Sequence, residues 1–294
     1  MAQVQAQTTS KQAAATRGGT RSHLGENIFW YIVLCFVAAI TVLPFLWTLV
    51  TSLKGPQDSI VAVPLEFLPH DPTLANYVKV WNELPMAKFF VNSVIVTVST
   101  TALNLLITAL AAYPFAKMNF RGRDAIFYLL LATFIVPPQL TYIPGFVLAQ
   151  NFFHYYNSLF ALIFPNLATV LNIFMLRQAF KTVPNDLIDA AKMDGASELR
   201  IWWQILLPII RPSLATCGII TFVVSWNDFL WPSLMLPTMD NKTLTVGLAA
   251  LQGMFSSDLR ATAAGIIITI VPILIVFIAL QKQFVRGLSG AIKG

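Results

Sequence analysis

Residues 182–212 read TVPNDLIDAAKMDGASELRIWWQILLPIIRP and contain signals for two short helices joined by a turn. Proline favours the first turn of a helix, so Pro184 predicts a helix over residues 185–193. Gly195 then stops this helix, because glycine readily adopts the backbone conformation that ends one. The segment is the one long water-facing segment on its side of the expected membrane. Such a segment is suited to contact another protein.

A second helix should follow the glycine. Ser197 is a helix-capping residue, and Glu198 in the first turn suits the positive end of the helix dipole. The apolar residues that follow run to Pro208, where we expect the helix to end. The whole segment therefore predicts a helix, a glycine turn and a second helix.

One face of the first helix is shallow. Leu187, Ala190, Ala191 and Asp194 recur at helical spacing, and the two alanines allow another backbone to approach closely. The alternative is a helix lying in the lipid interface, which would favour an excess of Lys and Arg on its polar side. Residues 181–200 carry three basic and four acidic side chains, so the charge favours a protein partner.

The segment resembles the EAA loop of permease subunits in binding-protein-dependent ABC importers. The matching pieces are Asp189-Ala190-Ala191, Asp194-Gly195-Ala196, Leu207-Pro208 and Pro212. In that family the loop is cytoplasmic and forms coupling helices that sit in a cleft of an ATPase subunit. The resemblance implies ATPase-coupling roles for Leu187, Asp189, Ala190, Ala191, Asp194, Gly195 and Ala196. The family has glutamate where this chain has the shorter Asp189.

Composition excludes an ordinary soluble domain. Hydrophobic residues make up 56% of the 294 residues and charged residues only 11%, whereas soluble domains are about a quarter charged. Six apolar stretches are each close to the roughly 20 residues that cross a bilayer. They are residues 28–50, 89–112, 125–146, 159–175, 213–235 and 261–280. We therefore predict an all-α integral membrane protein with six transmembrane helices. The resemblance implies that it is similar to type I ABC importer permeases, with cytoplasmic coupling helices.

Lys and Arg residues predict the orientation. If the N-terminus is cytoplasmic, 14 of the 19 basic residues fall on the inside and five on the outside, as the positive-inside rule requires. We expect a disordered cytoplasmic tail over residues 1–27, a transmembrane permease domain over residues 28–283 that includes the loop 182–212, and a cytoplasmic C-terminal tail over residues 284–294. Both termini are then cytoplasmic.

Polar residues and prolines interrupt several spans. Pro137 and Pro138 should break the third, which hydrocarbon tolerates only where protein or water satisfies the freed carbonyls. That break indicates either an interrupted helix near a solute site or a kinked structural helix. The second span is rich in hydroxyl and amide side chains, which either bind neighbouring helices or line a pore. They are Asn92, Ser93, Thr97, Ser99, Thr100, Thr101, Asn104 and Thr108.

Asp228 is the only acidic residue inside a predicted span. A carboxylate in the bilayer centre costs about 2.5–3.5 kcal/mol on insertion scales, so it must face protein or water. Asn227 and Asp228 either line the solute path or hold an outer gate by hydrogen bonding between helices. The surrounding stretch resembles a segment of sugar-importer permeases, and residues 284–294 resemble the C-terminus of MalG-like permease subunits of carbohydrate-type ABC importers.

The expected function is that of a transport subunit and not of an enzyme. The sequence contains no GxxxxGK[ST] phosphate-binding loop, so ATP and Mg²⁺ are expected on separate ATPase subunits. Cys35 and Cys217 both lie within predicted spans, and the sequence indicates no catalytic, metal-binding or cofactor-binding residues in this chain.

The resemblance implies an importer of a sugar or related polyol in the cytoplasmic membrane of a bacterium or archaeon. Its expected partners are a second permease subunit, two ATPases, an extracytoplasmic solute-binding protein and membrane lipid, without nucleic acid. The alternative is a secondary transporter driven by an ion gradient, for which Asp228 is the one candidate coupling group inside a span.

Overall fold

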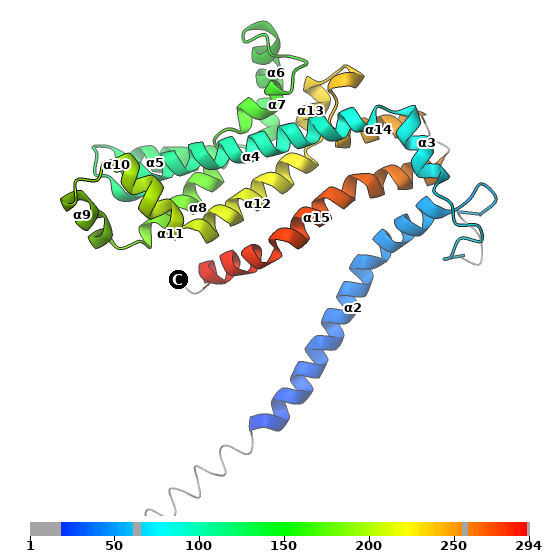
Figure 1. Cartoon of the computed structure of the whole chain (residues 1–294), viewed down its shortest axis with the longest axis horizontal. Helices are drawn as coiled ribbons and strands as arrows, with labels where there is room; N and C mark the ends of the chain where they lie inside the picture. Colours follow the sequence, from blue (N-terminus) through cyan, green and yellow to red (C-terminus); the bar gives the residue numbers. More distant parts are fainter. Residues whose placement is uncertain (1–18, 61–65, 255–257, 293–294) are drawn as a thin grey trace, which may run out of the picture. The chain divides into compact units, whose positions relative to one another are not determined.

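The computed structural model describes residues 19–60, 66–254 and 258–292, and every regular element in these ranges is helical (Figure 1). The chain divides into two compact units, Met1–Thr73 and Leu74–Gly294.

Helix α2 (Gly19–Leu53) is the regular element of the first unit. It begins at Gly19, within the tail over residues 1–27 that the sequence predicts as disordered, and residues 1–18 of that tail lie outside the described residues. The apolar part of α2 provides the helical nucleus, and adding further turns to an existing helix costs much less than starting one.

The second unit opens with α3 (Ala75–Glu83) and the long helix α4 (Met86–Lys117), and ends with the long helix α15 (Leu259–Ile292). The predicted C-terminal tail is therefore helical through residue 292. The elements between α4 and α15 are α5 (Arg123–Thr133), η1 (Pro138–Thr141), α6 (Tyr142–Asn151), α7 (Phe160–Ile163), η2 (Phe164–Asn166), α8 (Val170–Lys181), α9 (Asn185–Met193), α10 (Glu198–Arg200), the π-helical turn η3 (Ile201–Leu206), α11 (Leu207–Ile209), α12 (Arg211–Asn227), α13 (Leu230–Met235), η4 (Met239–Asn241) and α14 (Leu244–Met254).

The described residues contain six segments that could span a membrane by length and composition. Three are continuous helices, and three are pairs of helices bent at a short break. The continuous spans are Glu26–Leu53, Met86–Lys117 and Leu259–Ala279. The bent pairs are Arg123–Thr133 with Pro138–Asn151 (90°), Phe160–Asn166 with Val170–Lys181 (44°), and Glu198–Ile209 with Arg211–Asn227 (81°). Counting each pair once gives six, the number that the sequence predicts, although the last pair begins at Glu198, within the segment 182–212, and not at residue 213.

The third span breaks at Pro137 and Pro138, as predicted, but the fifth differs from the prediction of one helix over residues 213–235. Helix α12 ends at Asn227, and Asp228 is extended, with a ψ of 128°. The Asp228 carboxylate accepts hydrogen bonds from nearby backbone N–H groups, those of Phe229 and Trp231. Such local bonds compete with helical bonds, which accounts for the unwound step before α13.

Helix α4 is the centre of the second unit. It packs along α8 and α12, α12 packs on α15, and α3 and α14 also contact α15 (Figure 1). In Figure 1, α9, α10 and α11 lie at the opposite end of this unit from α3. The end of α4 near α9 belongs to one buried hydrophobic cluster, and its start near α3 belongs to another.

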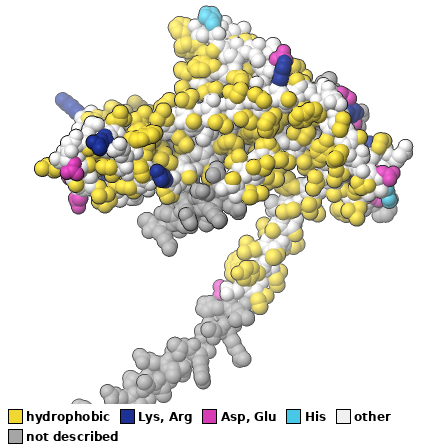
Figure 2. All heavy atoms as spheres, viewed as in Figure 1, with side chains coloured by type: hydrophobic (Ala, Val, Ile, Leu, Met, Phe, Trp, Pro, Cys, Tyr) yellow, Lys and Arg dark blue, Asp and Glu magenta, His cyan; other side chains and the backbone are white. Residues whose placement is uncertain are grey.

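Large hydrophobic side chains remain exposed on the second unit, among them Leu129 (70% exposed), Ile135 (82%) and Ile143 (77%). Figure 2 shows hydrophobic atoms over the middle of the visible face and charged side chains towards its ends. Apolar surface of this extent marks contact with a membrane or with other subunits.

Gly247 of α14 lies against a buried ring of α4. An added Cβ would come within 2.2 Å of Phe89 Cδ2, and Phe89 is fully buried. We expect Gly247→Ala to lower the free energy of unfolding by about 1–3 kcal/mol through overpacking, measured by thermal unfolding in detergent. Gly218→Ala is the matched control, because its Cβ would meet the flexible end of Leu105 at 3.1 Å. Equal stability of the two variants would contradict this account.

An ion pair connects α3 to the start of α15. Lys79 Nζ lies 2.8 Å from Asp258 Oδ2. The hydrogen bond to Asp258 raises the pKa of Lys79 above its ordinary 10.5. Burial would raise the pKa of Asp258, but hydrogen bonds from Lys79 and the Ala261 N–H hold it below the ordinary 3.8. The stability contributed by Asp258 is therefore present above pH 3.8 and is lost as the pH falls through its lowered pKa, whereas that of Lys79 is lost as the pH rises through its raised pKa.

We accordingly expect Asp258→Asn to lower the melting temperature at pH 7, with the difference from the wild type shrinking below pH 3.8. Asp240→Asn serves as the control, because Asp240 pairs with Lys88 at 2.7 Å on an exposed surface, where ion pairs contribute little. Melting curves recorded across this pH range provide the measurement. A constant difference down to pH 2 would exclude the ionised pair as its cause.

Candidate functional site

The segment predicted to contact a partner is a helix, a turn and a second helix. Helix α9 follows Pro184, and Gly195 in the turn behind it is left-handed, with a φ of +76°. The Ser197 hydroxyl accepts a hydrogen bond from the Arg200 N–H at 3.4 Å and caps α10. These three local predictions are confirmed.

The exposed face of α9 is narrower than the sequence predicts. Ile188 and Ala191 are buried in the hydrophobic cluster beneath the helix, whereas Leu187 (45% exposed), Ala190 and Asp194 are exposed. The prediction that Ala191 belongs to the free face is therefore wrong. An amphipathic helix first buries an i, i+3 pair against its own domain, and here that pair is Ile188 with Ala191. Of the other predicted residues, Asp189 and Gly195 are exposed and Ala196 is half-buried.

The second helix is longer and less regular than predicted. It passes through the π-helical turn η3 and ends at Ile209, one residue beyond Pro208. Trp202 is buried while its neighbour Trp203 is 61% exposed. Leu199 (65% exposed) and Trp203 add exposed apolar surface to the second helix.

Glu198 joins the segment to α4. Its carboxylate accepts a hydrogen bond from the Tyr113 hydroxyl and forms an ion pair with Lys192 at 2.7 Å. The hydrogen bond with Glu198 raises the pKa of Lys192. The ion pair thus links α9 to α10 across the turn, and the hydrogen bond from Tyr113 attaches the turn to α4.

Two further side chains bridge α4 and this segment. The Lys117 ammonium donates to the Val183 carbonyl at 2.5 Å and to Asn185 Oδ1 at 2.7 Å. The Trp202 indole donates to the Ala109 carbonyl at 3.3 Å. Sequence reasoning missed these contacts, because nothing in the local pattern pairs residues more than 60 positions apart.

A cavity of about 470 Å³ lies between α4, α8, α12 and the broken third span. Asp228 lines it, whereas Asn227 is exposed and donates to the Val223 carbonyl of its own helix at 2.8 Å. Because α12 unwinds after Asn227, the side chains of Asn227 and Asp228 have different surroundings. Of the two residues that the sequence proposes for a solute path or gate, only Asp228 lines this cavity.

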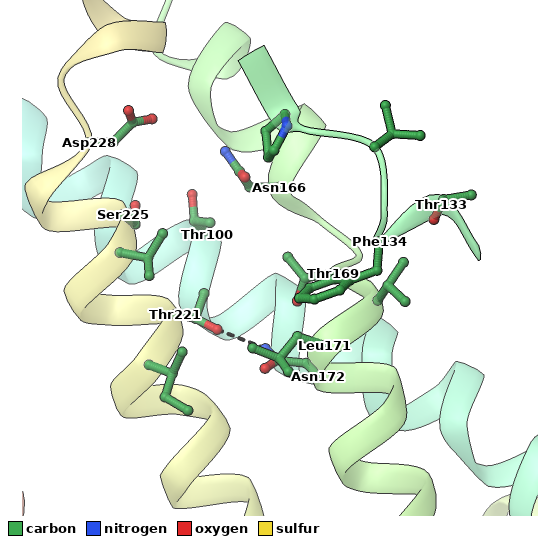
Figure 3. A pocket seen from close by; sticks show the side chains of 15 residues that line it. Thr100, Thr133, Phe134, Asn166, Thr169, Leu171, Asn172, Thr221, Ser225 and Asp228 are labelled. Carbon is green, nitrogen blue, oxygen red and sulfur yellow. Dashed lines mark hydrogen bonds between the residues drawn. The ribbon is translucent and has the colours of Figure 1, made fainter. Parts of the chain in front are cut away.

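Asn166 and Asn172 line this cavity, and the buried Asn104 forms hydrogen bonds with both. Asn172 Nδ2 donates to Thr221 Oγ1 at 2.8 Å (Figure 3). It also donates to Asn104 Oδ1 at 2.7 Å, and Asn104 Nδ2 donates to the Asn166 carbonyl at 2.7 Å. Asn104 and Asn172 are at most 1% exposed. The polar residues of the second predicted span signalled such contacts, but their partners on α8 and α12 were not predictable from spacing.

A second cavity of about 430 Å³ adjoins the first and is lined by the aromatic rings of Tyr142, Phe153, Tyr155, Phe164 and Trp231. Asp228, Asn166 and Pro138 line both cavities. Trp231 is held by a hydrogen bond from its indole to the Ala161 carbonyl at 2.9 Å. The unwound step at Asp228 therefore lies where the two cavities meet.

Residues 104–290, from the middle of α4 into α15, match the family described as "Binding-protein-dependent transport system inner membrane component". The chain belongs to this family. Among its relatives, the lactose transport system permease protein LacG of Rhizobium radiobacter is 32% identical over 267 residues, covering 91% of this chain and 96% of LacG. The arabinooligosaccharides transport system permease protein AraQ of Halalkalibacterium halodurans is 34% identical over 271 residues, covering 90% and 96%.

The melibiose/raffinose/stachyose import permease protein MelC of Bacillus subtilis is also 32% identical over 267 residues, covering 90% of this chain and 95% of MelC. A solved chain shares the fold. It comes from the crystal structure of a bacterial ABC transporter involved in the import of the acidic polysaccharide alginate, with a TM-score of 0.76 and 23% identity, covering 90% of this chain and 98% of that chain.

The contact between Tyr113 and Glu198 can be tested directly. Tyr113→Phe removes a hydroxyl that donates to a carboxylate, so we expect a loss of about 1.5–3 kcal/mol in unfolding free energy and faster amide hydrogen exchange in α9 and α10. Tyr128→Phe is the control, because Tyr128 is 68% exposed. If Tyr113→Phe leaves exchange in α9 and α10 unchanged, the hydroxyl does not fasten the segment.

Proposed function

We propose that the chain is a permease subunit of an ATP-driven ABC importer that moves a sugar or related polyol across the cell membrane. Its family and its nearly full-length similarity to saccharide permeases support this function. Membership in a binding-protein-dependent family favours an importer over an ion-gradient transporter.

We further propose that α9 is a coupling helix that inserts into an ATPase subunit. The observation that carries this proposal is a helix whose inner residues, Ile188 and Ala191, are packed on its own domain, while Leu187, Ala190 and Asp194 face outward. Asp189 lies beside this face, and Gly195 and Ala196 follow it in the turn. A helix held in this way transmits displacement, because the anchoring contacts to α4 oppose independent movement of the segment.

The mechanism then requires partners that bind nucleotide. ATP and Mg²⁺ bind to two ATPase subunits, and ATP binding favours one of the two arrangements of the membrane helices over the other. The coupling helix carries that preference to α4 and α12. The exposed hydrophobic surface of the second unit contacts a second permease subunit and lipid, and a solute-binding protein docks on the outer face.

In this proposal the chain lies in a bacterial or archaeal cytoplasmic membrane with both termini and α9 on the inside. The excess of Lys and Arg on the predicted inner segments supports this orientation.

Gly195→Val tests the coupling role. The residue has open space around an added Cβ but a φ of +76°, so the substitution strains the backbone without a steric clash. Left-handed backbone costs about 1–2 kcal/mol for residues with a Cβ. We expect a roughly five- to thirty-fold loss of ATP-driven uptake and less ATPase recovered with the permease, at unchanged membrane insertion.

Gly122→Val is the matched control, because Gly122 has a φ of +84° in the turn before α5, outside the coupling segment. This variant should retain the ATPase. Wild-type uptake and full ATPase recovery by Gly195→Val would refute the coupling role.

A further inference from the structure

The hydroxyl of Thr100 faces the first cavity. Thr100 is 1% exposed, lines the cavity, and its Oγ1 has no hydrogen-bond partner among the described residues. In Figure 3 this oxygen points into the space bounded by Ser225, Asn166 and Asp228. A buried hydroxyl is normally hydrogen-bonded, so one directed into a cavity indicates that a ligand group or water binds there.

Among the described residues that line the cavity, the only charged side chain is negative. Asp228 is its one acidic side chain, and no Lys, Arg or His is among the described residues that line either cavity. Backbone N–H groups of Phe229 and Trp231 hold the Asp228 carboxylate, and the Thr245 hydroxyl donates to the Asp228 carbonyl at 2.8 Å. Among the described lining residues, the carboxylate therefore has backbone N–H groups nearby but no cationic partner.

The second cavity adds a different surface. Its rings form a rigid wall in which the centroids of Tyr142 and Trp231 lie 5.5 Å apart. Aromatic rings accept the apolar faces of ligands, while a few convergent polar groups fix their orientation. A sugar ring has both kinds of surface, with C–H groups on its faces and hydroxyl groups around its edge.

We propose that the junction of the two cavities is a saccharide subsite on this subunit that selects uncharged sugars over acidic ones. Asp228 accepts hydrogen bonds from sugar hydroxyls, and Thr100 supplies one further hydrogen bond. The aromatic wall packs against the face of a sugar ring. The subsite rests on the proposed importer function and adds the class of substrate.

The selection follows from the electrostatics. A uronic acid would bring a second carboxylate beside Asp228 without a cation to balance it, and two carboxylates in one site disfavour each other's ionised form. A neutral sugar offers hydroxyl donors to the same carboxylate. The structurally similar transporter imports an acidic polysaccharide, so a shared fold does not determine the charge of the solute.

Ligand-observed NMR on the complex of permeases and ATPases, purified from membranes into lipid nanodiscs without the binding protein, tests this subsite. The probes are lactose, melibiose and raffinose as neutral sugars and digalacturonate as the acidic one. We expect saturation transfer to at least one neutral sugar and much less to digalacturonate. Thr100→Val should weaken the neutral signal roughly three- to tenfold, as loss of one hydrogen bond does.

Thr97→Val is the matched control, because Thr97 is also 1% exposed, its Oγ1 also has no partner among the described residues, and it does not line either cavity. It should bind like the wild type. Asp228→Asn should lower the preference for neutral over acidic probes about tenfold, because the charge is removed while the shape is kept.

The subsite is overturned if no neutral probe binds, if Thr100→Val binds as Thr97→Val does, or if Asp228→Asn leaves the preference unchanged. The importer function has separate readouts, namely recovery of the ATPase with the permease and ATP-dependent uptake. Those readouts can stand when the subsite fails, so the two failures are distinguishable.

Discussion

The hydrogen bonds that join Asn104, Asn172 and Thr221 connect the three helices on which the second unit depends. Each amide is buried between α4, α8 and α12, and each finds its partner on another helix. In a low-dielectric interior an unpaired amide is costly, so this network favours one register of the three helices over its alternatives. The register in turn determines where the ends of α8 and α12 lie.

The cavities lie where the ends of these helices meet the broken third span. The third span breaks at Pro137 and Pro138, and α12 stops before Asp228. Backbone freed by such breaks has to bond to protein or water, which confines the breaks to the interior of the assembly. Irregular backbone and polar side chains therefore gather in the same place, and the cavities lie between them.

Helix α12 also connects the two proposed sites. It begins directly after the coupling segment and ends at Asn227, next to the junction of the cavities. Its 17 residues extend over roughly 25 Å. Between α9 and α12 lie α10, η3, α11 and an 81° bend at the break between Ile209 and Arg211, so a displacement at α9 has to pass this bend to reach Asp228.

The membrane class, the six spans, the helix, turn and helix around Gly195, and the family resemblance could all be predicted from the sequence alone. These features depend on composition, on local periodicity and on residues close together in the chain. The tertiary structure decided that Ala191 faces inward, that Asp228 but not Asn227 lines a cavity, and that Tyr113 fastens Glu198. The reason is that burial and hydrogen bonding between distant residues depend on how the helices pack, and spacing along one helix does not specify its neighbours.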